Sequence, residues 1–303
     1  MTDLISINDL TRKEIEEILE LTDSLKKNKF SSVLSGKTLA LVFQKPSNRT
    51  RVSFEVGMYQ LGGNSIYLSP DEISLGVRES IKDVAKTLSR YIDAIVLRTF
   101  AHKNVLEMAE YSDKPVINGL SDFLHPCQAL ADIYTVKEKL NNLKGLTLAY
   151  VGDGNNVCNS LTYICAKLGL NMNIAAPKGY SPDKKVLEEA NCIAKKEGST
   201  VSLFNKAAEA VKNADVIYTD VWTSMGQEKE AKERKRLFKD FQINKKLSAL
   251  AKKSCLIMHC LPAHRGEEIT DEVIDGPNSV VFDQAENRMH VQKAVLIKLL
   301  GNV

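Results

Sequence analysis

The sequence of 303 residues lacks the features that mark several large classes of protein. No stretch approaches the roughly 18 consecutive apolar residues that a membrane-spanning helix requires, so we predict no membrane span. The first residues, MTDLISINDLTRKEIEE, contain no basic segment followed by an apolar run, so no secretory signal is expected. The six cysteines form no Cys-x-x-Cys pair and lie mostly in apolar runs, which is typical of reduced thiols in a cytoplasmic protein.

The sequence also has little net charge. It contains 41 Lys and Arg against 38 Asp and Glu, for a formal net charge of +3, which argues against a strongly basic nucleic-acid-binding protein. The most basic segment, Lys229–Lys239, is interrupted by Glu230 and Glu233 and contains a single aromatic residue, so we interpret it as a solvated helix face. Any anion site must therefore be built locally from a few arginines and backbone N–H groups.

Short apolar runs recur along almost the whole chain, and their near-continuous apolar character favours strands of parallel sheets that are covered on both faces. A length of 303 residues, at about 150 residues per domain, suggests two domains. The predicted strands are Thr38–Phe43, Asp93–Leu97, Leu146–Val151, Met172–Ala175, Ala214–Tyr218 and Cys255–Met258.

Helical periodicity separates these runs, and the strand–helix alternation predicts an α/β fold with right-handed crossovers. A capping box at Thr11–Glu14 starts the first helix, and Gly62 and Gly63 end the second. A polar turn, residues 141–145, predicts a domain boundary, with one domain over 1–141 and another over 142–283. The predicted helices are Thr50–Leu61, Glu79–Tyr91, His125–Leu140 and about Gln284–Leu300.

The segment Ser47-Asn48-Arg49-Thr50-Arg51 joins the first predicted strand to a helix. A helix start offers free backbone N–H groups and the positive end of the helix dipole, and hydroxyls and arginines there suit a phosphate. No G-x-x-x-x-G-K-[ST] loop occurs, so this is not the common nucleotide loop. A capped helix start with surface arginines is the alternative explanation.

Two further motifs follow predicted strands or start helices. Gly152-Asp153-Gly154-Asn155-Asn156 begins like a dinucleotide fingerprint, but Val157 stands at the third glycine position, which disfavours a nicotinamide cofactor. Its asparagines offer neutral hydrogen-bonding amides at the carboxyl end of a strand. His125, at the start of a helix, is expected to be a neutral imidazole that donates to a carbonyl oxygen, or else a simple helix cap.

The last two motifs lie in the second half of the chain. In the segment Asp220–Gln227, Asp220 can hold an ammonium group, while Ser224 and backbone N–H groups can hold a carboxylate, although an ordinary surface loop also fits. The segment from Met258 to Glu268 contains two histidines and a cysteine, but their spacing matches no standard zinc ligand set. We therefore predict that the protein holds no metal.

Taken in order, these motifs resemble those of the aspartate/ornithine transcarbamylase family, over essentially the full chain. The residues that carry the resemblance are Ser47–Arg51, Arg98-Thr99, His125–Gln128, Asp220–Gly226 and His259–Pro262. The Ser-Met-Gly loop and the His-Cys-Leu-Pro motif point to the ornithine branch of the family. One departure is Asn48, where the family usually carries threonine.

The resemblance implies a carbamoyl-phosphate domain that is completed by the C-terminal helix, residues 284–303, and a Rossmann-like ornithine domain. Phosphate would be held by Ser47, Asn48, Arg49 and Thr50, and the carbonyl polarised by Arg98, His125 and Thr50. Gln128, Arg288, Cys260 and Leu261 would orient the carbamoyl amide. Asn156, Asp220, Ser224 and Met225 would bind ornithine, with Cys260 and Asp220 near the attacking amine.

The implied activity is transfer of the carbamoyl group of carbamoyl phosphate to the δ-amine of L-ornithine, giving L-citrulline and phosphate. The resemblance also implies a cytoplasmic homotrimer with active sites near subunit interfaces, no cofactor, and no membrane or nucleic-acid partner. His264–Glu268 is similar to biosynthetic members, which suggests arginine biosynthesis. A transcarbamylase acting on putrescine or an N-acylated ornithine is the alternative.

Overall fold

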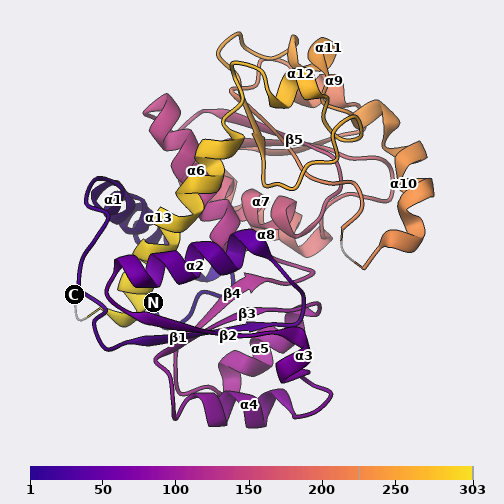
Figure 1. Ribbon diagram of the computed structural model, residues 1–303. Helices are drawn as coiled ribbons and strands as arrows, with labels where there is room; N and C mark the ends of the chain where they lie inside the picture. The colour runs from indigo at the N-terminus through magenta and orange to yellow at the C-terminus, as the bar shows by residue number, and fades with distance from the viewer. Residues whose placement is uncertain (225, 302–303) are drawn as a thin grey trace. The chain divides into compact units, whose positions relative to one another are not determined.

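Two parallel β-sheets organise the protein in the computed structural model, which describes residues 1–224 and 226–301 (Figure 1). The chain divides into two compact units, the first formed by residues 1–131 and 286–303 and the second by residues 132–285. The divisions fall inside helices α6 (Pro126–Leu140) and α13 (Val281–Leu300). The predicted α/β class, with two parallel sheets flanked by helices, is confirmed, and the functional boundary at 141–142 stays a prediction.

The first unit contains a four-stranded sheet in the order β2-β1-β3-β4. The central strands β1 and β3 are almost wholly buried, as expected for parallel strands covered on both faces. The register pairs the last residue of β1, Phe43, with Arg98 at the end of β3, so the turns after these two strands start side by side. The strands are β1 (Thr38–Phe43), β2 (Asn64–Leu68), β3 (Ala94–Arg98) and β4 (Val116–Leu120).

Helices cover both faces of this sheet. Ile81, Val84, Val105 and Met108 from α4 and α5 pack with the apolar side chains of one face, and Figure 1 shows α2 on the opposite face. The helix α2 begins where Ser47 caps it, two residues earlier than the sequence predicts. The helices are α1 (Arg12–Lys27), α2 (Asn48–Gln60), α3 (Pro70–Ile73), α4 (Ile81–Leu88) and α5 (His102–Tyr111), with a short 3-10 helix at Ile7–Asp9.

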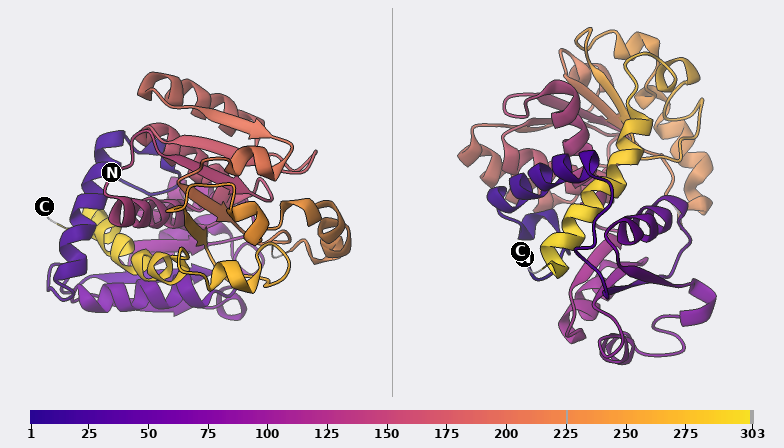
Figure 2. Two further views of the ribbon diagram at one scale, coloured as in Figure 1. Left: turned by 90° about the horizontal axis from the view of Figure 1, so that it is seen from above. Right: turned by 60° about the vertical axis from the view of Figure 1, so that its left-hand side comes forward.

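The C-terminal helix α13 lies beside α1, although the two stand at opposite ends of the sequence (Figure 2). Lys298 Nζ lies 2.6 Å from Glu17 Oε2, and Lys26 Nζ donates to Asn287 Oδ1 at 2.8 Å. Deeper in the same unit, the buried Lys293 donates to Gln60 Oε1 at 3.0 Å. These contacts place residues 286–300 in the first unit, and Arg288 comes with them.

The second unit contains a five-stranded parallel sheet in the order β7-β6-β5-β8-β9. Counted from β5, this is the 3-2-1-4-5 order of a doubly wound Rossmann sheet, as the resemblance implies. The strand order reverses between β5 and β8, which lie side by side. The strands are β5 (Thr147–Val151), β6 (Asn171–Ala175), β7 (Val201–Phe204), β8 (Val216–Thr219) and β9 (Leu256–His259).

The helices of the second unit form two layers on this sheet. Apolar side chains from α9 and α12 pack on one face around Ala149, Ile217 and Ile257, and Figure 1 shows α7 and α8 on the other. Asn155 caps α7, so the turn after β5 passes directly into a helix start. The helices are α7 (Asn156–Leu168), α8 (Lys184–Glu197), α9 (Ala207–Val211), α10 (Ala231–Leu237), α11 (Lys245–Ser248) and α12 (Asp271–Ile274), with 3-10 helices at Glu228–Glu230 and Lys239–Phe241.

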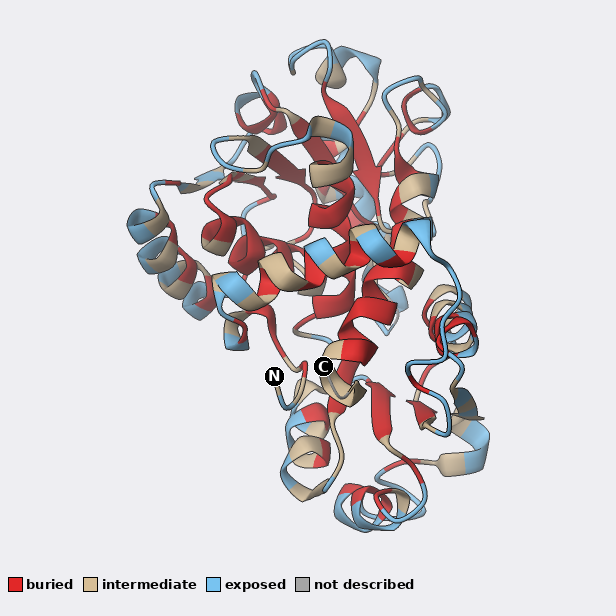
Figure 3. Cartoon of the chain, turned by 90° about the vertical axis from the view of Figure 1, so that its left-hand side faces the viewer, coloured by how far each residue is buried: buried red, intermediate tan, exposed pale blue. Residues whose placement is uncertain are grey.

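The strands form the buried centre of each unit, and the outward faces of the helices are exposed (Figure 3). All six predicted strands are present, with ends within two residues of the prediction. The strands β2, β4 and β7 were not predicted. Within the described residues, none of the helices is long and apolar enough to cross a membrane.

Candidate active site

The first unit gathers cationic and hydroxyl side chains at the start of α2. The Ser47 hydroxyl accepts a hydrogen bond from the Thr50 N–H at 3.4 Å, which leaves other N–H groups of the first turn pointing out of the helix end. Thr50 is buried, Arg49 is partly exposed and Asn48 is exposed. This arrangement has the N-terminal geometry that anions prefer, as the sequence predicts.

Two arginines converge on Thr50 from distant parts of the chain. Arg98 Nη1 donates to Thr50 Oγ1 at 3.4 Å, and Arg288 Nη2 donates to the same oxygen at 3.2 Å. Arg288 Nη1 also donates to Gln128 Oε1. Thr50 Oγ1 therefore accepts from two guanidinium groups, so its own hydroxyl hydrogen is available for another acceptor. The structure thus brings together four residues that the sequence predicts for one site.

His125 is buried in the same unit, one residue before α6. Burial lowers the pKa of the imidazole well below its usual value, and the positive charges of Arg288, Arg98, Lys45 and Arg49 lower it further. The side chain is therefore neutral at neutral pH, as predicted. The main cause is burial, with nearby cations adding to it.

Lys45 is a candidate residue that the sequence reasoning missed. It is buried two residues before Ser47, and its ammonium nitrogen lies 4.9 Å from the centre of the Phe100 ring. Burial, followed by the charge of Arg98, lowers its pKa to about 8. The sequence could have indicated Lys45 by its position in the strand-to-helix turn, because such a turn directs several successive residues toward one helix end.

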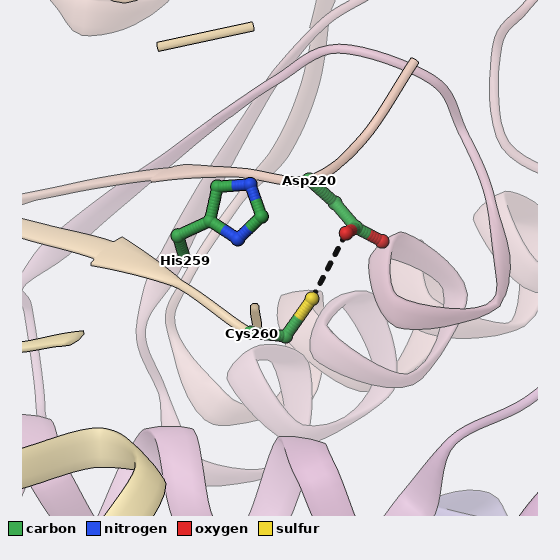
Figure 4. Close-up of side chains that lie close together, drawn as sticks. All are labelled: Asp220, His259 and Cys260. Carbon is green, nitrogen blue, oxygen red and sulfur yellow. Dashed lines mark hydrogen bonds between the residues drawn. The ribbon is translucent and has the colours of Figure 1, made fainter. Parts of the chain in front are cut away.

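The second unit gathers its polar groups at the carboxyl ends of β5, β8 and β9, which are neighbours in the sheet. Asp220 follows β8, and its Oδ1 lies 2.9 Å from Cys260 Sγ, which follows β9 (Figure 4). Asn155 Nδ2 donates to Asp220 Oδ2 at 2.7 Å from the turn after β5. The sequence predicts hydrogen-bonding amides from both Asn155 and Asn156 here, but assigns only Asn156 to the ornithine site, whereas Asn155 contacts Asp220.

The predicted ornithine-binding residues are only partly described. Asn156 is the first residue of α7 and is partly buried. Ser224 is also partly buried, and its N–H donates to Gln227 Oε1 at 3.1 Å. Met225 lies outside the described residues. The roles assigned to these residues remain predictions.

His259 and Glu268 form a fully buried pair that supports the turn of Cys260 and Leu261. His259 Nδ1 accepts from the Leu261 N–H at 2.8 Å, so Nε2 carries the hydrogen that faces Glu268 Oε1 at 3.1 Å. The same carboxylate oxygen accepts from the His264 N–H at 2.5 Å. Glu268 lies in the predicted motif but was not predicted as a site residue.

The side chains of Asp220, His259 and Cys260 are close enough together to be considered as metal ligands, with their ligand atoms within 4.8 Å of one another (Figure 4). However, both ring nitrogens of His259 already face partners within the chain. Cys260 and Asp220 also face each other. This donor set does not fit a metal ion, and the absence of a metal stays a prediction.

The basic segment Lys229–Lys239 differs from its predicted role at one residue. It forms α10 and flanking 3-10 turns, but Arg234 is buried, where a solvated face was expected. Its Nη1 donates to Asp153 Oδ2 and to the Trp222 carbonyl, each at 2.9 Å. The prediction fails here because these acceptors are distant in sequence. Arg234 thus ties the loop after β8 to the turn after β5.

Comparison with known proteins agrees with this arrangement. Residues 2–138 match the family described as "Aspartate/ornithine carbamoyltransferase, carbamoyl-P binding domain", and residues 144–299 match the corresponding "Asp/Orn binding domain". The chain belongs to the aspartate/ornithine carbamoyltransferase family. The family resemblance expected from the motifs is therefore confirmed.

Several relatives of this carbamoyltransferase chain are similar over nearly their whole length. An ornithine carbamoyltransferase of Thermococcus kodakarensis is 55% identical, with 99% of this chain and 97% of the relative covered. An anabolic ornithine carbamoyltransferase of Pyrococcus furiosus is 54% identical with the same coverage. The solved structure of ornithine carbamoyltransferase from Pyrococcus furiosus has a TM-score of 0.97 at 53% identity, covering 99% of this chain and 97% of that one.

The buried ion pair of Asp153 and Arg234 predicts a pH-dependent contribution to the stability of this carbamoyltransferase. Burial raises the pKa of Asp153 to about 6, while Arg234 acts in the opposite direction. From about pH 4 to about pH 6, the folded protein holds a proton that the unfolded chain has lost, so the free energy of unfolding falls as pH rises. Urea unfolding should show that Asp153→Asn loses this dependence, worth up to about 3 kcal/mol.

An exposed aspartate provides the matched control for this measurement. Asp240→Asn, on the surface of the second unit, should leave the pH dependence of the free energy of unfolding as it is in the parent protein. Parallel curves for the parent and Asp153→Asn between pH 4 and pH 7 would contradict a titration of this buried carboxyl.

Proposed function

We propose that this protein transfers the carbamoyl group of carbamoyl phosphate to the δ-amine of L-ornithine, giving L-citrulline and phosphate. The observation that carries the proposal is the convergence of Arg98 and Arg288 on the Thr50 hydroxyl at the start of α2. A dianionic acyl phosphate needs such a site, where a helix end and guanidinium groups act together. Relatives that are 54–55% identical over the full chain carry the name ornithine carbamoyltransferase.

In this proposal the first unit binds carbamoyl phosphate. The phosphate is held by the first turn of α2, through Ser47, Asn48, Arg49 and Thr50. Arg98, His125 and Thr50 donate hydrogen bonds to the carbamoyl oxygen. Gln128 and Arg288 orient the carbamoyl amide, and the assignment of Cys260 and Leu261 to the same amide is part of the proposal.

The second unit binds ornithine in the same proposal. Asp220 accepts hydrogen bonds from the α-ammonium group, while Ser224 and nearby backbone N–H groups hold the carboxylate. Asn156 and Met225 complete the set that the family resemblance implies. A free α-amino acid needs a carboxylate and donors of this kind at one end, whereas putrescine has no carboxylate to bind and an N-acylated ornithine has no α-ammonium.

The transfer requires a free amine and a polarised carbonyl. The δ-ammonium of ornithine resembles that of lysine, with a pKa near ~10.4, so it must lose a proton before its nitrogen attacks. As the C–N bond forms, negative charge grows on the carbamoyl oxygen, where the neutral imidazole of His125 and the guanidinium of Arg98 stabilise it. The C–O bond to phosphate then breaks, the attacking nitrogen gives up its extra proton to the leaving phosphate, and Arg49 and the helix end balance the remaining charge of that phosphate.

A substrate panel tests the proposed function. Purified protein is supplied with carbamoyl phosphate and either ornithine, putrescine, aspartate or N-acetylornithine, and both the carbamoylated product and the released phosphate are measured. Citrulline and phosphate should form in equal amounts with ornithine, with little product from the other amines. Faster turnover of any other amine would overturn the substrate assignment.

Arg98→Ala tests the role of the carbonyl-binding group. Loss of one donor to a developing oxyanion costs roughly 3–4 kcal/mol, so turnover of ornithine should fall by about 10²–10³-fold. Arg90→Ala, which removes an exposed arginine from the same unit, should keep parental turnover. Circular dichroism shows whether Arg98→Ala is folded, and near-parental kcat in a folded variant is incompatible with the assigned role.

The homotrimer is also part of the proposal. Its support on the surface is a stripe of exposed apolar side chains on α2, Val52, Val56 and Tyr59, which recur at helical spacing, with exposed Ile66 on the neighbouring β2. Analytical ultracentrifugation should give a mass three times that of the chain. Tyr59→Lys should lower this mass if the stripe lies in the interface, whereas a purely monomeric parent protein would refute the trimer.

We further propose a cytoplasmic role in arginine biosynthesis. Cys127, Cys158, Cys165 and Cys255 are buried thiols, which suits a reducing compartment, and the relative from Pyrococcus furiosus is named anabolic. Deletion of the gene should create a requirement for citrulline or arginine, and fractionation should recover the activity with the cytoplasm. Growth without either amino acid would contradict the biosynthetic role.

A further inference from the structure

In the second unit, hydrogen bonds hold both ends of the Asn155 side-chain amide. Its Oδ1 accepts from the backbone N–H groups of Val157 at 3.0 Å and Cys158 at 3.2 Å, which cap α7. Because a backbone N–H can only donate, the capping atom must be the amide oxygen. The NH₂ group therefore points the other way, toward Asp220.

Tyr150 adds a third donor to the same oxygen. Its hydroxyl lies 3.2 Å from Asn155 Oδ1, and its ring stacks on Tyr218 with centroids 5.8 Å apart. Burial raises the pKa of Tyr150 well above its usual value, and the nearby Asp220 raises it further. The phenol therefore keeps its hydrogen over the working pH range and holds the Asn155 amide in one orientation.

Asp220 is held on both of its carboxylate oxygens. Asn155 Nδ2 donates to Oδ2 at 2.7 Å, while the Val221 N–H at 2.8 Å and Cys260 Sγ at 2.9 Å face Oδ1. A carboxylate offers roughly four lone-pair positions, so about one further position is left for a substrate N–H. The buried carboxylate of Asp220 is thus aimed before any substrate arrives.

We propose that Asn155 is a positioning residue that aims Asp220 at the α-ammonium group of the amino-acid substrate, and that Tyr150 holds Asn155 in the required orientation. This inference rests on the proposed function and assigns a role to two residues that do not touch the substrate. Their effect must therefore appear in the binding of the amine and leave the binding of carbamoyl phosphate unchanged.

Asn155→Asp is the decisive substitution because it is nearly isosteric. Aspartate caps helices as well as asparagine does, and it can still accept the Tyr150 hydroxyl. The substitution replaces only the NH₂ donor, with a carboxylate oxygen that faces Asp220. At pH 8.5, KM for ornithine should rise at least tenfold, and KM for carbamoyl phosphate should stay within twofold of the parent value.

A pH series separates positioning from a merely structural effect. Two adjacent carboxylates share a proton as pH falls, and the protonated carboxyl can donate to Asp220 as the amide did. The ratio of variant to parent KM for ornithine should therefore decrease from pH 8.5 to pH 6.5. Protonation of ornithine itself cancels in this ratio. The other titratable groups near the pair are shared by both proteins: Tyr150, Asp153, Cys158, Tyr218, His259 and Cys260.

Three further variants complete the experiment. Asn155→Ser keeps a capping oxygen and introduces no charge, so its raised KM ratio should not vary with pH. Tyr150→Phe, which removes one hydroxyl and keeps the stacked ring, should raise KM for ornithine by about threefold. Asn191→Asp adds the same charge at an exposed position of α8, where solvent screens it, and should match the parent.

The outcomes distinguish this inference from the proposed function. A parent protein that carbamoylates no ornithine refutes the function, and the KM comparison then uses whichever amine it accepts. A parental KM for the amine in Asn155→Asp overturns the positioning role, and so does a KM ratio that stays constant with pH. If Asn155→Asp fails to fold, a parental KM in Asn155→Ser overturns the role in the same way.

Discussion

The structure depends on one property of parallel sheets: the carboxyl ends of neighbouring strands lie at the same edge, and the turns that follow them diverge where the strand order reverses. In the first unit this reversal lies between β1 and β3, and in the second between β5 and β8. Thr50 follows β1 and Arg98 ends β3, while Asn155 follows β5 and Asp220 follows β8. These four residues are therefore placed by the topology of the sheets before any local interaction acts.

Burial and neighbouring charges set the protonation state of the side chains at the candidate site. His125 is kept neutral by burial and by the cations around it, whereas Arg98 and Arg288 share the Thr50 oxygen as charged donors. The net charge of +3 does not reveal that these cations lie close together, because they come from separate stretches of a nearly balanced sequence. In the second unit, Asp220 is instead held by neutral donors, the Asn155 amide and the Val221 N–H.

The sequence predicted the central strands more completely than the outer ones, for a physical reason. β1, β3, β5 and β8 are continuous apolar runs because both of their faces are buried. β2 and β7 are edge strands with exposed positions, and β4 contains Asn118 and Gly119. Asn118 is tolerated in this strand because its side-chain amide donates to the Ile5 carbonyl. Gly119 is required there because a Cβ at this position would lie 2.9 Å from the Val96 side chain.

The sequence alone determined the α/β class, the capped start of α1, and most of the chemistry-bearing residues, because each depends on neighbours within a few positions. Only the tertiary structure decided which of them meet. Arg288 reaches Thr50 because α13 returns to the first unit, and Arg234 is buried because Asp153 and Trp222 accept its hydrogen bonds. The contact of Asn155 with Asp220 likewise follows from the orientation of a helix start, which local sequence does not specify.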